Sequence, residues 1–321
     1  MKDHLHKLTF LAVFLFVVTG ALAAQASQPL TVYAIRGPSG VGMIRLFENP
    51  PVVGGVPVKM EALAQADLMA AKFISGEAKV GILPANIAAK IASTGKRIQI
   101  AAVTGTGMLS LLSSDASIRG IGDLKGKSVE VAGQGATPDY VFRRILLAKG
   151  LKADQDVQLG YALAYPEIAQ SLIAGRVATG LLPEPFATMA RTGNPALRQV
   201  GDVQAEWISA GGSGNYPMTV LVVDAGYAKA EPGNIRAVLN VLKASIEWVV
   251  ANPREAGTLV EKHDLGLKAP VVTAAIPRSN YVYIPAKEAR PSLEALYGTF
   301  LQFSPASIGG KLPADNFYLE F

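Results

Sequence analysis

The sequence predicts an α/β protein of two similar lobes, each a mostly parallel sheet flanked by helices, joined by a two-strand hinge. Three observations support this fold class. One stretch of the chain repeats about a hundred residues later, strand-like and helix-like segments alternate, and 321 residues suit one large or two ordinary domains. Only 17% of the residues are charged, against about 25% in an average protein, which argues against disorder.

The chain begins with the pattern of a secretory signal peptide. Two lysines precede an apolar run at 8–24, and small residues follow. A charged start, an apolar middle and an A-x-A end predict a signal peptide at 1–26, cleaved after Ala26, with cleavage after Ala23 as the alternative. An uncleaved membrane anchor is the other interpretation, but the run is shorter than the about 20 residues of a spanning helix. We therefore expect an exported, soluble mature protein.

The internal repeat sets the architecture. Residues 70–88 match residues 169–187 at an offset of 99, and each copy is typical of a helix, a Gly stop, a short apolar strand, a Pro loop and a second helix. The identical pairs are Ala70/Ala169, Ile74/Ile173, Gly76/Gly175, Gly81/Gly180, Leu83/Leu182, Pro84/Pro183 and Ala88/Ala187. Chance self-similarity is the alternative. The matching order of elements favours two similar lobes, and two copies are too few for a solenoid.

The elements upstream of each copy also correspond. A predicted strand at 30–35 leads into a Gly-Pro-Ser-Gly loop, and a predicted strand at 128–132 leads into a loop at 134–138, at an offset of 98. In the first half, Asp67 can cap a helix that stops at Gly76. In the second half, Thr137 is a good N-cap with Pro138 at the first helical position.

The remaining elements place the hinge. Apolar residues at helical spacing predict a helix over 235–249, another begins after Asn252, and 288–300 is a further helix disturbed at Pro291. Strand-like segments at 98–113 and 218–223 bracket the second half. If the chain leaves lobe I at the first and returns at the second, lobe I comprises 27–108 and 219–321, and lobe II comprises 109–218. A ligand cleft then lies between the lobes, beyond the carboxyl ends of their strands.

Enzyme motifs are mostly missing from the sequence. There is no cysteine, which excludes disulfides, thiolate catalysis and Cys-zinc sites. The G-K-S at 126–128 lacks the first Gly of a phosphate-binding loop, and the G-Q-G at 133–135 has Pro138 in place of the last Gly of a dinucleotide fingerprint. His263, the single histidine after the signal peptide, has a polar context typical of the surface. We predict no catalytic residue, cofactor or metal site.

Binding signals are present instead. Ser39, Asn86, Thr137 and Glu184 all follow predicted strands at helix starts, where free N–H groups suit anionic groups. The alternative is that Ser39 and Thr137 only cap their own helices, and that Glu184 has a capping or lobe–lobe role.

Aromatic and basic residues supply further candidates for ligand contacts. Tyr33, Phe186 and Tyr216 could form an aromatic wall, with core packing as the default for Phe186. Arg278 could pair with an anionic ligand or brace the hinge. The mild net charge of +5 is scattered, so nucleic acid is a poor candidate partner.

Several motifs together resemble a known family. They are D-L-K-G-K-S-V at 123–129, G-Q-G-A-T-P-D at 133–139, L-P-E-P-F at 182–186, A-N-P-R-E-A at 251–256 and I-P-R-S-N at 276–280. In this order they resemble the periplasmic solute-binding proteins of ABC importers, in the nitrate, sulfonate, taurine and thiamine-precursor group. The resemblance covers nearly all of the mature chain. It implies a two-lobed type II periplasmic binding protein fold that closes on one small molecule.

The resemblance also implies partners and contact residues. A monomeric receptor would deliver an anionic or heterocyclic solute to a membrane permease driven by a separate ATPase subunit. Ligand contacts would come from the loop with Pro38 and Ser39, from the loop ending at Asn86, from the loop running from Gly135 through Thr137 to Asp139, and from Glu184. The chain lacks a lipid-anchor cysteine, which fits a freely diffusing periplasmic protein. The alternatives are an enzyme on the same fold, in pyrimidine or menaquinone-precursor metabolism, and a ligand sensor.

Overall fold

The larger of two main sheets has six strands in the computed structural model, which describes residues 29–320. Its order is β13-β6-β12-β5-β1-β4. The strands are β1 (Thr31–Ile35), β4 (Lys59–Leu63), β5 (Val80–Pro84), β6 (Ile98–Thr106), β12 (Pro217–Asp224) and β13 (Tyr281–Pro285). β4, β1 and β5 are parallel, and β12 runs antiparallel between β5 and β6. We call this sheet and the helices packed on it lobe I.

The smaller sheet repeats part of that arrangement. Its order is β11-β7-β10-β8-β9, and it defines lobe II. The strands are β7 (Leu109–Ser113), β8 (Ser128–Val131), β9 (Gln158–Gly160), β10 (Thr179–Pro183) and β11 (Arg198–Gln199), and a separate hairpin pairs β2 (Val52–Val53) with β3 (Val56–Pro57). The series β9-β8-β10 is parallel and is followed by antiparallel β7, as β4-β1-β5 is followed by antiparallel β12. The predicted repeat is confirmed by this shared topology.

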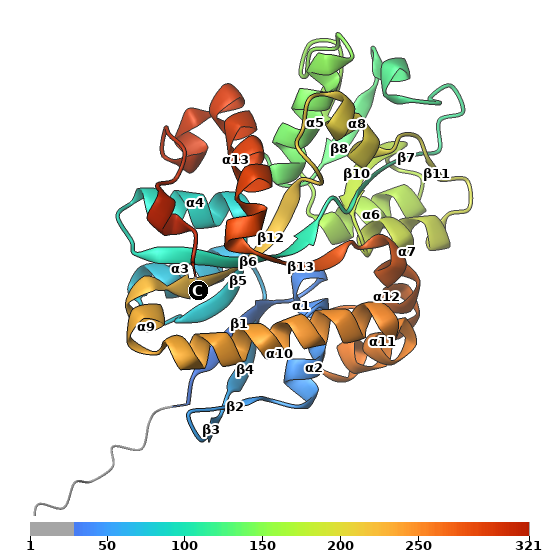
Figure 1. The fold of residues 1–321 in the computed structure, drawn as a ribbon. Coiled ribbons are helices and arrows are strands. Elements are labelled where there is room, and N and C mark those ends of the chain that lie inside the picture. The colour runs from blue at the N-terminus through green and yellow to red at the C-terminus, as the bar shows by residue number, and fades with distance from the viewer. Residues whose placement is uncertain (1–28, 321) are drawn as a thin grey trace, which may run out of the picture.

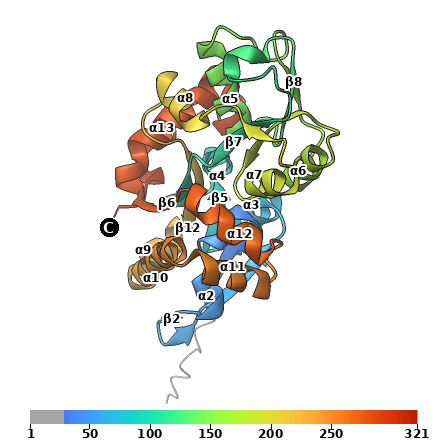
Figure 2. The ribbon, with the colours of Figure 1, turned by 90° about the vertical axis from the view of Figure 1, so that its right-hand side faces the viewer.

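Helices cover both faces of the larger sheet (Figures 1 and 2). Alternate residues of β1 point to opposite faces: Tyr33 belongs to a core with α3, α4 and α13, and Val32 to a core with α2, α10 and α11. The helices of lobe I are α1 (Pro38–Val41), α2 (Ile44–Glu48), α3 (Ala66–Ser75), α4 (Ala85–Ser93), α9 (Ala225–Ala230), α10 (Pro232–Ala251), α11 (Pro253–Lys262), α12 (Ala269–Ala275) and α13 (Ala286–Phe303). Those of lobe II are α5 (Thr137–Ala148), α6 (Tyr165–Ile173), α7 (Phe186–Gly193) and α8 (Val203–Ser209). Short 3-10 turns lie at η1 (Ile121–Leu124), η2 (Ile276–Arg278), η3 (Pro305–Ile308) and η4 (Asp315–Phe317).

The chain crosses between the sheets twice, side by side. It leaves the larger sheet after β6 and returns at β12, as the teal and gold strands of Figure 1 show. The Gly107 N–H donates to the Tyr216 carbonyl at 2.9 Å, and the Asn280 amide donates to the Gly107 carbonyl at 2.6 Å. A Cβ at position 107 would lie 1.7 Å from Asn215 Oδ1 and 2.1 Å from Gln204 Oε1, so a larger residue here would displace both side chains. These contacts lie at the two-strand hinge that the sequence predicts between the lobes.

The start of one helix and the course of another differ from the predictions. Helix α3 has Gln65 at its N-cap, so Asp67 lies inside the first turn, while Gly76 ends the helix in the left-handed conformation as expected. The predicted helix over 288–300 is α13, which continues through Pro291 and packs on lobe II as well as lobe I. Its Phe300 ring contacts Tyr140 of α5 edge-on at 4.8 Å. The lobe division at 108/109 and 218/219 stays a proposal.

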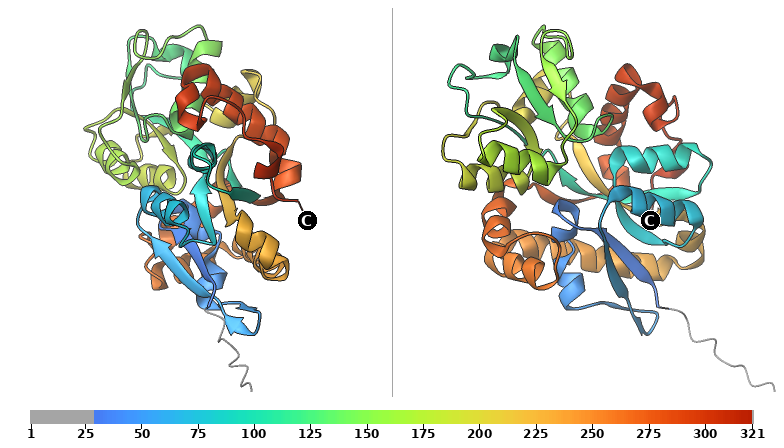
Figure 3. Two further views of the ribbon diagram at one scale, coloured as in Figure 1. Left: turned by 90° about the vertical axis from the view of Figure 1, so that its left-hand side faces the viewer. Right: turned by 180° about the vertical axis from the view of Figure 1, so that it is seen from behind.

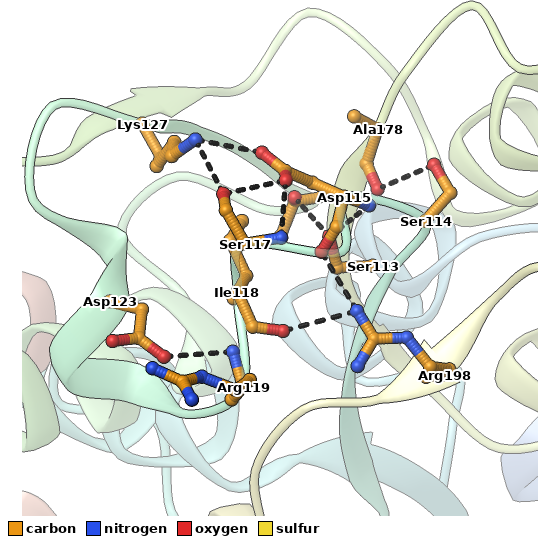
Figure 4. A network of polar contacts seen from close by, with 11 residues as sticks. Ser113, Ser114, Asp115, Ser117, Ile118, Arg119, Asp123, Lys127, Ala178 and Arg198 are labelled. Carbon is orange, nitrogen blue, oxygen red and sulfur yellow. Dashed lines mark hydrogen bonds and ion pairs between the residues drawn. The ribbon is translucent and has the colours of Figure 1, made fainter.

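The motif at 123–129 has a structural role at the far end of lobe II. Asp123 accepts hydrogen bonds from the backbone N–H groups of residues 119 and 120, and the Lys127 ammonium reaches Asp115 Oδ2 at 2.8 Å (Figure 4). Asp115 also accepts from the Ser117 hydroxyl and N–H. Because Lys127 and Ser117 stabilise the carboxylate form, the pKa of Asp115 lies well below its ordinary 3.8. The motif therefore fastens the loop between β7 and β8.

Part of the sequence analysis falls on residues 1–28, which lie outside the described residues. The predicted signal peptide at 1–26 and its cleavage site belong there. Over residues 29–320, no helix is both long enough and apolar enough to cross a bilayer.

The Asp115 network makes stability depend on pH in a defined direction. A carboxylate whose pKa is lowered by folding stabilises the native state above its unfolded-state pKa, and this contribution is lost as the pH falls. We expect Asp115→Asn to lower the melting temperature at pH 7, and the gap to the wild type to shrink as the pH falls below 3.8. Differential scanning calorimetry over a pH series measures both. A gap that is constant at all pH values would contradict the assignment.

Candidate functional site

Two cavities of the described residues take their lining from both lobes, a small one of about 250 Å³ beside α7 and α12 and a larger one at the strand ends. The larger has a volume of about 670 Å³. Its lining includes Ile35, Pro84 and Pro183, the last residues of β1, β5 and β10, and Ala132, which follows β8. Open α/β sheets bind ligands at such strand ends. Three other cavities of about 700, 680 and 650 Å³ border the C-terminal segment, and lobe II contributes no residue to them. We therefore assign the candidate site to the cavity at the strand ends of both lobes, and call it the cleft.

Four of the predicted site residues lie in the cleft. Pro38 and Ser39 come from the start of α1, Asn86 from the first turn of α4 and Thr137 from the first turn of α5. The Ser39 hydroxyl donates to the Ile35 carbonyl at 3.4 Å, which is long for a hydroxyl hydrogen bond. These residues are far apart in the sequence, and the facing strand ends of the two lobes bring them together.

Asn86 and Thr137 carry buried oxygens without partners. Their side chains are 9% and 3% exposed, and neither Asn86 Oδ1 nor Thr137 Oγ1 has a hydrogen-bond partner among the described residues. The prediction that Thr137 is the N-cap was wrong by one position, because Ala136 occupies the N-cap and the Thr137 hydroxyl caps nothing. A buried polar atom without a partner costs about 1–3 kcal/mol. Both oxygens belong to residues that line the cleft.

The structure places Gly135 and Asp139 behind the cleft lining. Asp139 is 2% exposed and accepts from the Gly135 N–H at 2.8 Å, so it completes the start of its own helix α5. Its other oxygen accepts from the Arg143 guanidinium at 2.6 Å and the Tyr161 hydroxyl at 2.7 Å. Because burial and the Asp139 charge disfavour its phenolate, the pKa of Tyr161 is raised. These contacts use the Asp139 carboxylate fully, and we leave it and Gly135 out of the proposed contact set.

Glu184 also has local partners. It is 1% exposed and lies outside the cleft lining. One carboxylate oxygen accepts from the Thr188 N–H at 2.9 Å and the other from Arg191 at 3.0 Å. The first contact completes the start of α7, and the second neutralises the buried charge. The geometry of Glu184 matches helix capping, one of the two alternatives to ligand binding that the sequence analysis gives for this residue.

Tyr33 and Arg278 lie away from the cleft for different reasons. The side chain of Tyr33 packs in the core beside α3, and its hydroxyl donates to Glu77 at 3.2 Å. Burial raises the pKa of Tyr33. Arg278 is exposed and donates to the Ala274 carbonyl at 3.2 Å, close to the contact between α12 and α7. Neither contributes to the cleft lining.

The aromatic wall of the cleft differs from the predicted one. Phe186 lines the cleft, whereas Tyr216 is fully buried at the hinge, where the Leu109 N–H donates to its hydroxyl at 3.3 Å. The second aromatic residue of the wall is Tyr165, which stacks on Phe186 with ring centroids 5.9 Å apart. Burial raises the pKa of Tyr165 to about 12, so its hydroxyl is protonated at neutral pH.

A family model and solved structures agree with this architecture. The model described as NMT1/THI5 like matches residues 54–256, which is more than half of the chain and includes both copies of the repeat. The chain belongs to the NMT1/THI5-like family. A comparison with curated proteins gave no match.

Among solved structures, this NMT1/THI5-like protein resembles an ABC transporter from Parabacteroides distasonis. The two are 27% identical with a TM-score of 0.77, over 91% of this chain and 99% of that one. It also resembles the periplasmic aliphatic sulphonate-binding protein SsuA from Escherichia coli, at 17% identity and a TM-score of 0.70, over 91% and 96% of the chains. The nitrate-binding protein NrtA from Synechocystis PCC 6803 is 14% identical with a TM-score of 0.59, over 76% and 68%. The last two likenesses show the fold alone, that of type II periplasmic binding proteins.

The repeat contains a signal for the lining residues that sequence reasoning missed. At the offset of 99 that joins Pro84 to Pro183, Gln65 corresponds to Ala164 and Ala66 to Tyr165, and all of these residues line the cleft. At the offset of 98, Pro38 corresponds to Ala136 and Ser39 to Thr137, again all in the lining. Met108 and Met218 at the crossing strands, and Thr219 beside them, have no such signal.

The pairing of Glu184 with Arg191 gives a stability prediction for this NMT1/THI5-like protein. Arg191→Met leaves the buried Glu184 carboxylate without its counter-charge. We expect the free energy of unfolding to fall by about 3 kcal/mol, the lower limit for breaking a buried ion pair, because Arg191 itself is 24% exposed. Urea denaturation followed by circular dichroism measures the loss. We expect the double variant Glu184→Gln/Arg191→Met to regain most of it, because the amide needs no counter-charge. A double variant as unstable as Arg191→Met alone would show that the buried charge is not the cause.

Proposed function

We propose that the protein is an extracytoplasmic solute-binding receptor of an ABC importer. It captures one small molecule in the cleft and presents the closed form to a membrane permease that a separate ATPase subunit drives. The observation that carries this proposal is the cleft, a cavity of about 670 Å³ lined by equivalent strand ends and helix starts of the two lobes. A ligand that contacts both lobes favours the closed arrangement, because only there does it make all its contacts.

The family and the structural likenesses support this function. The similar structure from Parabacteroides distasonis is described as an ABC transporter, and the two lower-identity likenesses are described as periplasmic binding proteins. An importer receptor works outside the cytoplasm, which agrees with the signal peptide predicted at 1–26. The proposed contact set takes Pro38, Ser39 and Asn86 from lobe I and Thr137 from lobe II.

The first test is a thermal-shift screen of the mature chain, residues 27–321, with sulfonates, nitrate, bicarbonate, pyrimidines, flavins, purines and small carboxylates. A ligand at a hundred times its Kd stabilises the folded state by about 2.7 kcal/mol. We expect a hit to lose its effect in Ala66→Trp, which fills the cleft from α3. The matched control is Ala71→Trp on the exposed side of the same helix, which should keep the effect.

Each outcome of the screen has a meaning. A hit that survives Ala66→Trp would place binding outside the cleft and contradict the proposal. A hit that the protein converts to a new compound, detected by chromatography after incubation, would favour the enzyme alternative. If no compound shifts the melting temperature of protein that is verified as folded and ligand-free, the assignment moves towards a sensor or towards another class of solute.

A further inference from the structure

A second large cavity lies at the opposite edge of the larger sheet from the cleft. Thr219 of β12 lines the cleft, whereas Ala225, which follows the far end of the same strand, lines this cavity. Residues 219 and 224 are about 17 Å apart along an extended strand. The cavity has a volume of about 700 Å³, and its walls are the end of α4, the loop at 94–97, helix α9 and the segment after η3 (Figure 1). We call it the rear cavity.

The lining of the rear cavity carries an excess of positive charge. Four exposed basic residues from three separate segments belong to it: Lys96, Arg97, Lys229 and Lys311. Over residues 29–320, none of these four side chains forms a hydrogen bond, an ion pair or a ring contact. The cations therefore gather around one cavity without a counter-charge from the protein.

Acidic residues near the rear cavity are engaged elsewhere. Glu320, the one acid of its described lining, forms an ion pair with Lys287 at 3.6 Å. Asp224 at the end of β12 accepts from the Tyr227 N–H at 2.7 Å and so caps α9. Because like charges around one cavity repel each other, a bound anion would lower the electrostatic free energy of this region.

Apolar surface lies between the basic residues. Ile308 and Phe317 are buried in the wall, and Leu312 is 41% exposed. Covering an exposed leucine with the apolar part of a ligand is favourable, because it removes apolar surface from water. A volume of about 700 Å³ is in the range of pockets that hold small organic molecules. The rear cavity therefore suits a molecule that has both an anionic group and an apolar body.

The number of cations indicates which anionic group fits. A phosphate monoester carries a charge of about −1.5 to −2 at pH 7 and has three strong acceptor oxygens, so it can contact several basic side chains at once. Lysine ammonium and arginine guanidinium groups both bind phosphate. A carboxylate or a sulfonate carries a single negative charge and offsets less of the repulsion.

We propose that the rear cavity is a second binding site, which takes an organic phosphate: the basic residues hold the phosphate and the apolar wall contacts the body of the molecule. The site is separate from the cleft, and it goes beyond the proposed function. The phosphate group can belong to a soluble compound or to a lipid headgroup, and the tests below separate these two sources.

Three probes of similar shape test the ligand chemistry by isothermal titration calorimetry on the mature chain. Phenyl phosphate is close to a dianion, benzenesulfonate is a monoanion and phenol is uncharged. We expect phenyl phosphate to bind at least about threefold more tightly than benzenesulfonate, and phenol not to bind. The affinity should fall as salt is added, because exposed charges are screened. Benzenesulfonate that binds as tightly as phenyl phosphate would overturn the choice of phosphate.

The variant Ala66→Trp separates the two cavities. It fills the cleft and leaves the rear cavity unchanged, so the affinity for phenyl phosphate should stay the same. If Ala66→Trp abolishes the binding of phenyl phosphate, the probe binds in the cleft, and the inference of a second site falls while the receptor function stands.

A double variant with a matched control tests the basic residues. Arg97→Ala/Lys229→Ala removes two cations of the lining, and we expect phenyl phosphate to bind about five- to tenfold more weakly. Lys152→Ala/Arg254→Ala removes the same charge at exposed positions outside the lining and should keep the affinity. Leu312→Glu adds a negative charge to the lining and should weaken binding as well. Equal weakening in both double variants would show a general effect of net charge and would contradict the site.

Vesicle sedimentation identifies the source of the phosphate. If vesicles containing phosphatidic acid bind the wild type but not Arg97→Ala/Lys229→Ala, and phosphatidylcholine vesicles bind neither, the site takes a lipid headgroup. If phenyl phosphate binds and the vesicles do not, the site takes a soluble phosphate. If neither phenyl phosphate nor phosphatidic acid binds, the inference is wrong.

Discussion

The double crossing beside Gly107 is the constraint on which the rest of the arrangement depends. Two strands pass between the sheets next to each other, joined by the Gly107–Tyr216 backbone bond and held from outside by Asn280. Because a right-handed β-α-β order brings the parallel strand ends of each sheet to one edge, this crossing turns the two edges towards each other. The cleft follows from this connectivity, before any ligand-contacting side chain is considered. Figure 3 shows the two lobes on either side of the crossing.

The sequence was sufficient for the fold because the repeat carries topology. Similar spacing between strands and helices in the two halves predicted two similar lobes, and the shared order β4-β1-β5 and β9-β8-β10 agrees. The position of α13 was not predictable in the same way. Apolar spacing shows that a helix has a buried face, but it does not show which surface covers that face. Here the helix packs on β6 and β13 of lobe I and also meets α5 of lobe II, through Phe300 against Tyr140 and through Thr299, which accepts from Arg144 at 2.8 Å.

The site was predicted in part for an equally physical reason. Strand ends identified Pro38, Ser39, Asn86 and Thr137, because position in a parallel sheet decides what faces the cleft. Carboxylates at helix starts were harder to interpret, since they suit a ligand and a helix equally. The sequence did contain a discriminating signal: Asp139 has Arg143 one turn later, and Glu184 has Arg191 two turns later. A buried acid with a basic residue on its own helix face is satisfied without a ligand.

The links between the lobes bear on how the cleft can close. Arg144 of α5 donates to the Ala210 carbonyl of lobe II and to Thr299 of α13, so the C-terminal half of α13 is fastened to lobe II. The same half is also attached to lobe I, because the Tyr297 hydroxyl donates to the Ala85 carbonyl of α4 at 3.0 Å. The helix packs on β6 and β13 of lobe I as well. Neighbouring residues of α13 therefore contact both lobes, and a rotation between the lobes has to shift these packed contacts as well as the crossing strands.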